Sequence, residues 1–135
     1  MEGPDKRPVV VVEDDVSMSQ AMERILRLAQ LVSVTFASAE EVLAAGIADD
    51  AMCLIIDVQL PGLNGFALRD RLAAQRRRLP PVIFISAFDE PEARAQAASA
   101  NAVFLTKPFS GRTLLEAIRH ANSPAPTTAA KAVRP

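Results

Sequence analysis

Residues 8–15 read Pro-Val-Val-Val-Val-Glu-Asp-Asp, and this stretch decides the fold. Its four valines are β-branched and show no alternation of apolar and polar residues, which is typical of a strand covered on both faces. Strands of this kind belong to parallel sheets, whose neighbouring strands are joined by long crossovers. The run stops abruptly at three acidic residues. The sequence therefore predicts a buried parallel strand with carboxylates at its carboxyl end.

The same pattern recurs along the chain. Cys53-Leu-Ile-Ile-Asp57 and Pro81-Val-Ile-Phe-Ile-Ser86 are apolar until their last residue. Between such runs, apolar residues stand at helical spacing, as in residues 17–29, and Ser38-Ala-Glu-Glu41 has the form of a capping box. Five alternations of strand and helix predict an α/β fold with helices on both faces of a parallel sheet. The expected strands are 8–12, 32–36, 53–57, 81–86 and 102–106, and the expected helices are 17–29, 38–45, 66–77, 92–100 and 110–121, with Ser38 and Ser110 counted as caps.

Length and composition indicate a single domain. The chain has 135 residues, half of them hydrophobic, which is enough for one buried core. The polar residues 1–7 are expected to form a disordered start, residues 8–122 the domain, and the Pro-, Ala- and Thr-rich residues 123–135 a flexible tail or linker. The single cysteine, Cys53, cannot form an internal disulfide, and no secretory segment opens the chain. We therefore expect a cytoplasmic protein.

Charge and aromatic content argue against nucleic acid as a partner. The formal net charge of −1 provides no excess of basic residues to bind phosphates, and Trp and Tyr, whose rings could stack on bases, are absent. The run Arg76-Arg77-Arg78 is interpreted as the solvated end of a helix rather than a nucleic-acid contact. His120, the only histidine, is interpreted as a solvated residue near the end of the last helix. No apolar run approaches the roughly 20 residues that span a bilayer, so we expect no membrane contact.

Polar side chains end the predicted strands at their carboxyl ends, where ligands bind in open α/β sheets. Carboxylates gathered there would raise one another's pKa unless a cation lay among them. Hard carboxylate oxygens without His or Cys suit Mg²⁺. The residues are Glu13 and Asp14 after the first strand, Asp57 after the third, Ser86 after the fourth and Lys107 after the fifth.

A carboxylate nucleophile, a magnesium ion, a lysine and a hydroxyl are the parts of a site for phosphoryl transfer to aspartate. This chemistry consists mostly of positioning and of neutralising the charge on the phosphoryl oxygens. The sequence offers no strong general base for hydrolysis. We therefore expect a slow, self-acting site rather than a fast enzyme.

Four motifs in this order resemble the receiver domain of two-component response regulators over residues 8–122. They are Val-Val-Glu13-Asp14-Asp15, Ile-Ile-Asp57-Val-Gln-Leu-Pro-Gly, Phe-Ile-Ser86-Ala87 and Leu-Thr-Lys107-Pro-Phe. The segment Phe36-Ala-Ser-Ala-Glu-Glu also resembles the branch that includes FixJ-type and LuxR-type regulators. The resemblance implies a flavodoxin-like, doubly wound sheet of five parallel strands in the order 2-1-3-4-5, with five helices.

The resemblance also implies a role for individual residues. Asp57 would be the phosphoacceptor, and Ser86 and Lys107 would contact the phosphoryl group. Ser86 would move on phosphorylation, Phe104 would be the aromatic switch residue, and the bond between Lys107 and Pro108 would be cis. The Mg²⁺ ligands would be Asp14 directly, Glu13 through water, Asp57, and the backbone carbonyl of Gln59. Glu13 departs from the commoner Asp-Asp pair, and Asn101 stands where Gly is usual.

The implied function is a signalling switch rather than an enzyme. Its phosphodonor would be a histidine kinase or a histidine phosphotransfer protein, and its output partner or C-terminal output domain is not identified by the sequence. A second copy of the chain, in a homodimer, is a further candidate partner. A phosphatase resembling haloacid dehalogenases would need a second Asp where Gln59 stands. The alternative is a degenerate receiver that acts as a phosphorylation-independent interaction module.

Overall fold

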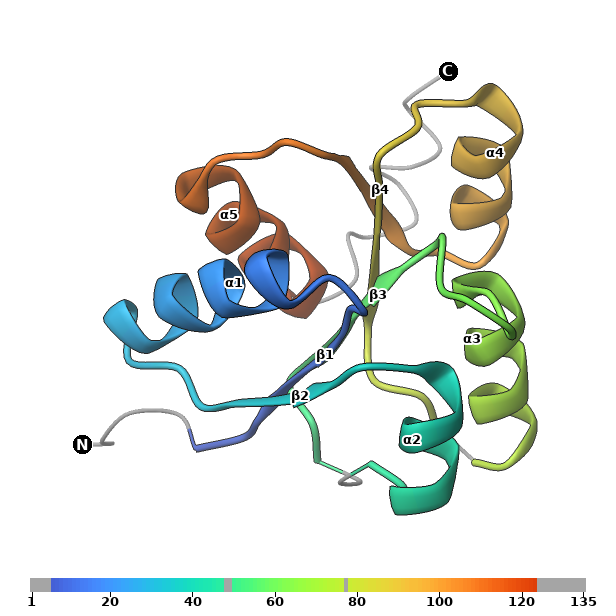
Figure 1. Cartoon of the computed structure of the whole chain (residues 1–135), viewed down its shortest axis with the longest axis horizontal. Helices are drawn as coiled ribbons and strands as arrows, with labels where there is room; N and C mark the ends of the chain where they lie inside the picture. The colour runs from blue at the N-terminus through green and yellow to red at the C-terminus, as the bar shows by residue number, and fades with distance from the viewer. Residues whose placement is uncertain (1–5, 48–49, 77, 124–135) are drawn as a thin grey trace.

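The computed structural model describes residues 6–47, 50–76 and 78–123. In this part of the chain strands and helices alternate, as Figure 1 shows. Most of the expected disordered start and nearly all of the expected tail or linker lie outside the described residues. The strands are β1 (Val9–Val12), β2 (Ser33–Phe36), β3 (Cys53–Asp57), β4 (Val82–Ser86) and β5 (Val103–Thr106). The helices are α1 (Val16–Leu28), α2 (Ala39–Ala45), α3 (Gly65–Ala74), α4 (Pro91–Ser99) and α5 (Gly111–Asn122).

The strands form one parallel sheet in the order β2-β1-β3-β4-β5, as expected. The chain therefore winds outward in both directions from β1 and β3. Such a reversal opens a crevice at the carboxyl ends of the central strands. The fold class, strand order and number of helices predicted from the sequence are confirmed.

The sheet separates two layers of helices, with α1 and α5 on one face and α2, α3 and α4 on the other (Figure 1). Successive side chains of a strand point to opposite faces, so β1, β3, β4 and β5 contribute to both hydrophobic clusters, whereas the edge strand β2 contributes Phe36 to one of them. In β1, for example, Val9 and Val11 pack under α1 and α5, whereas Val10 and Val12 pack under α2 and α3. This double burial explains why the strands read as continuous apolar runs.

Local hydrogen bonds set the helix ends. Ser38 Oγ accepts from the Glu41 N–H at 3.1 Å, and Glu41 Oε1 accepts from the N–H of Ala37, one residue before the expected capping-box partner. Two helices end in residues of positive φ that are not glycine, Gln30 (65°) after α1 and Asn101 (57°) after α4. Asn visits the left-handed region readily, whereas Gln does so at a steric cost. Asn101, which stands where Gly is usual, adopts the left-handed conformation that Gly favours, and Gln30 adopts the same conformation after α1.

The expected end of the third helix is wrong. Helix α3 ends at Ala74, so Arg76 and Arg78 follow the helix instead of completing it, and Arg77 lies outside the described residues. Arg76 is half-buried and its Nη1 donates to the Ile47 carbonyl at 3.5 Å. This arginine joins two loops at the amino end of the sheet and is not simply a solvated residue.

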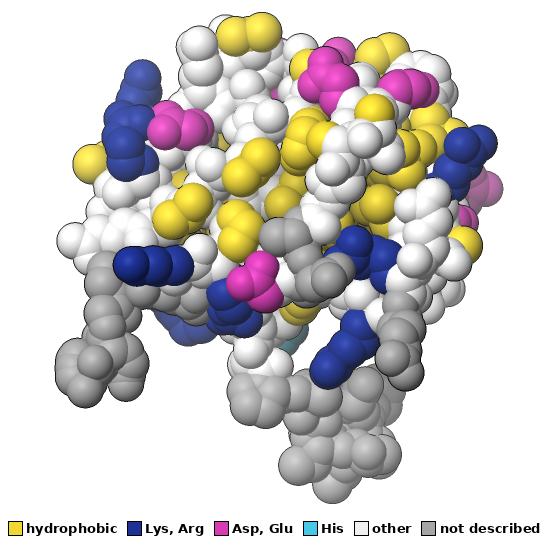
Figure 2. All heavy atoms as spheres, turned by 90° about the horizontal axis from the view of Figure 1, so that it is seen from below, with side chains coloured by type: hydrophobic (Ala, Val, Ile, Leu, Met, Phe, Trp, Pro, Cys, Tyr) yellow, Lys and Arg dark blue, Asp and Glu magenta, His cyan; other side chains and the backbone are white. Residues whose placement is uncertain are grey.

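One edge of the sheet is partly apolar. The edge strand β2 exposes Val34, and Val32 just before it is also exposed. Figure 2 shows the side of the molecule that lies at the bottom of Figure 1, where hydrophobic side chains gather at the centre and Lys and Arg stand around them.

Within the described residues, each helix is too short or too polar to cross a membrane.

Candidate functional site

Parallel pairing brings the ends of the central strands together. Glu13 follows β1 directly, and Asp57 is the last residue of β3, which pairs with both β1 and β4. Glu13 and Asp57 are buried, although both are acidic. A buried carboxylate is unfavourable without compensating partners. The site must therefore supply positive charge or hydrogen-bond donors at this end of the sheet.

Three of the predicted residues form an acidic cluster. Glu13, Asp14 and Asp57 each offer a carboxylate oxygen, and these oxygens lie within 4.8 Å of one another. Burial, followed by hydrogen bonding to Asp57, raises the pKa of Glu13 to about 7. A set of hard oxygen ligands, two of them buried and one exposed, fits Mg²⁺, which keeps several waters when bound to protein. The residues present are therefore compatible with the expected metal.

Lys107 lies against the same carboxylates. Its Nζ is 2.9 Å from Glu13 Oε1 and 3.0 Å from Asp57 Oδ2. Burial lowers the pKa of Lys107, but the hydrogen bonds to Glu13 and Asp57 outweigh it, so the net shift is upward and the ammonium stays charged. The Lys107 N–H donates to the Ser86 carbonyl at 2.7 Å, and the bond to Pro108 is cis, the isomer that the resemblance implies.

The loop after β3 holds the Asp57 carboxylate from its other side. The Gln59 N–H donates to Asp57 Oδ1 at 2.9 Å, so the two carboxylate oxygens face different donors. Gly65 closes this loop, and its N–H donates to the Val58 carbonyl at 3.1 Å. A Cβ atom on Gly65 would lie 2.4 Å from the Asp57 carbonyl oxygen. Only glycine permits this approach, which fixes the backbone of Asp57.

Ser86 is fully buried at the end of β4. Its Oγ accepts from the Phe88 N–H at 3.0 Å and lies 2.9 Å from the Phe88 carbonyl, so it is tied to its own loop. It also contacts the side-chain amide of Gln59, whose Nε2 is 2.9 Å away. The hydroxyl is therefore bonded to the loops around it.

Phe104 is half-buried on β5 and packs against the cluster under α2, α3 and α4. The guanidinium of Arg94, on α4, lies 5.0 Å from the centre of its ring. Arg94 also pairs with Asp89 and donates to Thr106 Oγ1 at 3.3 Å. One arginine thus connects the loop after β4, helix α4 and strand β5 around the expected switch residue.

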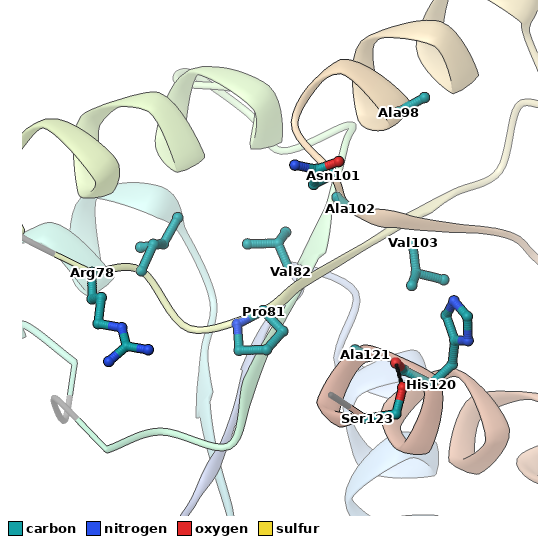
Figure 3. Close-up of a pocket in the computed structure, with 11 residues that line it drawn as sticks. Arg78, Pro81, Val82, Ala98, Asn101, Ala102, Val103, His120, Ala121 and Ser123 are labelled. Carbon is teal, nitrogen blue, oxygen red and sulfur yellow. Dashed lines mark hydrogen bonds between the residues drawn. The ribbon is translucent and has the colours of Figure 1, made fainter. Parts of the chain in front are cut away.

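A separate hollow lies at the opposite end of the sheet. It has a volume of about 660 Å³ and lies near the amino ends of β4 and β5. Figure 3 shows Arg78 and His120 on opposite sides of it, with Pro81 between them. None of the residues that line it carries a carboxylate. This hollow shares no residue with the acidic cluster and is not the site that the sequence predicts.

The structure brings Glu13, Asp14, Asp57 and Lys107 together, as expected, and places Ser86 and Gln59 beside them. The contacts of the Gln59 side chain and of Arg94 were not predicted. Neither side chain carries a sequence signal, since the bond between Gln59 and Ser86 joins two loops 27 residues apart and the contacts of Arg94 depend on how α4 packs beside β5. The close approach at Gly65 was detectable in principle from the Pro61-Gly-Leu-Asn-Gly65 turn.

Comparison with known proteins places this geometry in context. Residues 9–119 match the family model described as the response regulator receiver domain. Nodulation protein W of Bradyrhizobium diazoefficiens is 38% identical over 118 residues, which are 87% of this chain and 52% of that protein. Transcriptional regulatory protein TdiR of Thauera aromatica is 33% identical, over 84% of this chain and 50% of that protein. The chain thus spans about half the length of these relatives.

Solved structures agree. A response regulator receiver protein from Burkholderia phymatum is 36% identical with a TM-score of 0.74, and the match covers 90% of this chain and 99% of that one. The chemotaxis protein CheY4 of Vibrio cholerae has the same fold, with a TM-score of 0.78 at 24% identity over 87% of this chain and 99% of that one. The acidic cluster therefore lies in a fold shared with receiver proteins.

Proposed function

This chain belongs to the response regulator receiver domain family, and on that premise we propose that it accepts a phosphoryl group on Asp57 from a histidine kinase or a histidine phosphotransfer protein. The observation that carries the proposal is the setting of Asp57. Its carboxylate ends a buried strand, lies in a cluster with Glu13 and Asp14, and contacts the Lys107 ammonium at 3.0 Å.

The transfer step forms one bond and breaks one. A carboxylate oxygen of Asp57 attacks phosphorus, the P–N bond of the donor phosphohistidine breaks, and the imidazole keeps the electron pair. The carboxylates of Glu13, Asp14 and Asp57 and the backbone carbonyl of Gln59 would hold Mg²⁺. When bound, the ion supplies neutralisation of the charge on the phosphoryl oxygens.

Lys107 and the backbone of the loop after β3 are already positioned for this transfer. The ammonium is already held between two carboxylates, and it can follow the new negative charge onto the phosphoryl group with little movement. The Gln59 N–H and the close packing at Gly65 orient the nucleophile. Because His120 lies at the opposite end of the sheet, no imidazole is available as a general base. This supports slow turnover of the acyl phosphate and a signalling role instead of rapid catalysis.

The signal would pass through Ser86 and Phe104. In the proposed switch, the Ser86 hydroxyl turns toward the phosphoryl oxygens and Phe104 moves inward, which changes the surface formed by α4, β5 and α5. Nodulation protein W and TdiR are about twice as long as the segment that matches this chain, and TdiR is a transcriptional regulatory protein by name. We propose that this domain controls an output partner or an output domain through that surface.

Intact mass measurement tests the proposed function. The protein is incubated with Mg²⁺ and a small phosphodonor such as acetyl phosphate, beside the isosteric Asp57→Asn variant and an EDTA control. We expect a gain of one phosphoryl mass in the wild type alone. If folded wild-type protein gains no mass from any donor, the domain is a phosphorylation-independent interaction module.

A further inference from the structure

The hydroxyl of Ser86 already uses its full hydrogen-bonding capacity. A serine hydroxyl has one donor and two acceptor positions. Here it accepts from the Phe88 N–H at 3.0 Å and from Gln59 Nε2 at 2.9 Å, and it donates to the Phe88 carbonyl at 2.9 Å or to Gln59 Oε1 at 3.1 Å. Because Ser86 is fully buried, water cannot easily replace these partners. Any new acceptor must displace an existing one.

Gln59 differs from the other partner of Ser86. Phe88 lies two residues away on the same loop, whereas Gln59 is 27 residues away on the loop after β3. Gln59 Oε1 also accepts from the Ala87 N–H at 3.3 Å, so the amide is hydrogen-bonded to the start of the loop after β4. The backbone N–H of the same residue holds Asp57 Oδ1 at 2.9 Å. Gln59 therefore joins the expected phosphoacceptor to the expected switch hydroxyl.

We propose that the Gln59 side chain is a positioning residue that holds the Ser86 hydroxyl in its resting place and so sets how readily the domain switches. The inference rests on the proposed function, since it concerns the movement of Ser86 toward a phosphoryl group on Asp57. For the Ser86 O–H to donate to a phosphoryl oxygen, its bond to the Phe88 carbonyl or to Gln59 Oε1 must break. The oxygen must also rotate away from Gln59 Nε2.

The expected size follows from the worth of one hydrogen bond. A hydrogen bond of this kind changes an equilibrium by a factor of roughly 2 to 10. Gln59 is an exposed residue, so water can solvate its amide once Ser86 leaves. Its removal should therefore favour the switched state by that factor.

The variant Gln59→Met tests the side chain alone. Methionine has nearly the length of glutamine but no amide, and the substitution keeps the backbone N–H to Asp57 and the backbone carbonyl. Gln75→Met is the matched control, because Gln75 is exposed at the end of α3 and, among the described residues, it hydrogen-bonds through its backbone N–H, to the Leu72 and Ala73 carbonyls. Any general effect of replacing an exposed glutamine by methionine appears in both variants.

The first arm needs no phosphorylation. Amide hydrogen exchange at Ala87 and Phe88 is measured in the metal-free protein by NMR. We expect exchange at these amides to rise roughly 2- to 10-fold in Gln59→Met and to stay unchanged in Gln75→Met. Equal exchange in the two variants would overturn the inference whatever the outcome of the phosphorylation experiments.

The second arm measures switching. Beryllofluoride, a mimic of the phosphoryl group, is titrated in the presence of Mg²⁺, and the bound fraction is followed by fluorine NMR. Gln59→Met should bind it roughly 2- to 10-fold more tightly than wild type. In a Ser86→Ala background the same substitution should have no effect, because the hydroxyl through which it acts is gone. A purely structural role of Gln59 would give the same change in both backgrounds.

The two proposals fail in different ways. If the wild type binds neither the phosphoryl group nor its mimic, the proposed function is wrong and this inference falls with it. If the wild type is phosphorylated but Gln59→Met behaves like Gln75→Met in both arms, the proposed function stands and only the role of Gln59 is wrong.

Discussion

Helices α1 and α4 lie on opposite faces of the same sheet and are held to it in different ways. The side chains that α1 buries are large, Met22 and Leu26, whereas those that α4 buries are two alanines, Ala93 and Ala97. The free energy gained from burial rises with the apolar area removed from water, at roughly 25 cal/mol per Å². Helix α4 is therefore anchored more weakly than α1.

The same contrast holds at the helix ends. Asp15 caps α1 by accepting from the Met18 N–H at 3.2 Å, whereas Glu90 at the start of α4 makes no capping hydrogen bond with its side chain. The segment around α4 is connected instead by exposed polar contacts, those of Arg94 with Asp89 and Thr106. Regions with few buried apolar contacts open locally at low free energy. The weakly anchored helix is the one that follows Ser86 in the chain, which suits a segment that has to move.

Truncating one core residue in each layer gives the largest expected effect. Leu26→Ala should lower the free energy of unfolding by about 2–5 kcal/mol, because it leaves a cavity under α1. Ala97→Gly should lower it by about 1 kcal/mol, mostly through helix propensity. Urea denaturation of both variants measures the difference. Equal losses would mean that α4 is packed as firmly as α1.

The second prediction concerns how the buried carboxylate of Glu13 changes stability with pH. Folding raises the pKa of Glu13 from 4.5 to about 7. Between these two pH values the folded protein therefore keeps a proton on Glu13 that the unfolded chain has lost. In metal-free protein, Glu13 should therefore leave the free energy of unfolding unchanged below about pH 4.5. As the pH rises to about 7 it should lower this free energy progressively, by up to about 3 kcal/mol. Glu13→Gln removes that cost. In EDTA it should be more stable than wild type near pH 8, and the advantage should vanish near pH 4.5.

Denaturant titrations at both pH values, with and without Mg²⁺, check this prediction. The cation should reverse the order near pH 8, because it stabilises the ionised Glu13 that the variant lacks. A Glu13→Gln variant that is less stable than wild type near pH 8 in EDTA would show that Lys107 fully compensates the buried charge.

The smallest effect is expected at Arg94. Arg94→Met removes an exposed ion pair and the contact with the Phe104 ring, and should lower the melting temperature slightly. The matched control is Arg27→Met on α1, which removes the exposed ion pair with Glu23 and should lower the melting temperature less, because it breaks no ring contact. Thermal denaturation resolves the two. If Arg94→Met costs no more than Arg27→Met, the polar contacts of α4 do not compensate for its weak packing.

The sequence was sufficient for the fold because its central strands, β1, β3 and β4, are buried on both faces. Every strand and helix was expected within a few residues. Short apolar runs such as 53–57, when separated by segments of helical spacing, fit only the buried strands of a parallel sheet. Strand-end residues were expected at one crevice because parallel strands end together, and Glu13, Asp57 and Lys107 do meet there. The strand order itself came from the family resemblance.

What the sequence could not supply are contacts that depend on side-chain conformation. The end of α3 at Ala74 and the turn of Arg76 to Ile47 are set by packing between two loops. The bond between Gln59 and Ser86 joins two loops 27 residues apart. A polar side chain without a repeating pattern can point in several directions, and only the assembled sheet selects one.

The central claim is that a phosphoryl group on Asp57 acts on the weakly anchored segment around α4, residues 86–106. Hydrogen exchange measured residue by residue, with Mg²⁺ and a small phosphodonor, tests it most directly, with Asp57→Asn as the control and intact mass to establish full phosphorylation. The account predicts that exchange changes several-fold in residues 86–106 and stays unchanged in α1. A fully phosphorylated protein in which α1 changes as much as α4, or in which neither changes, would contradict it.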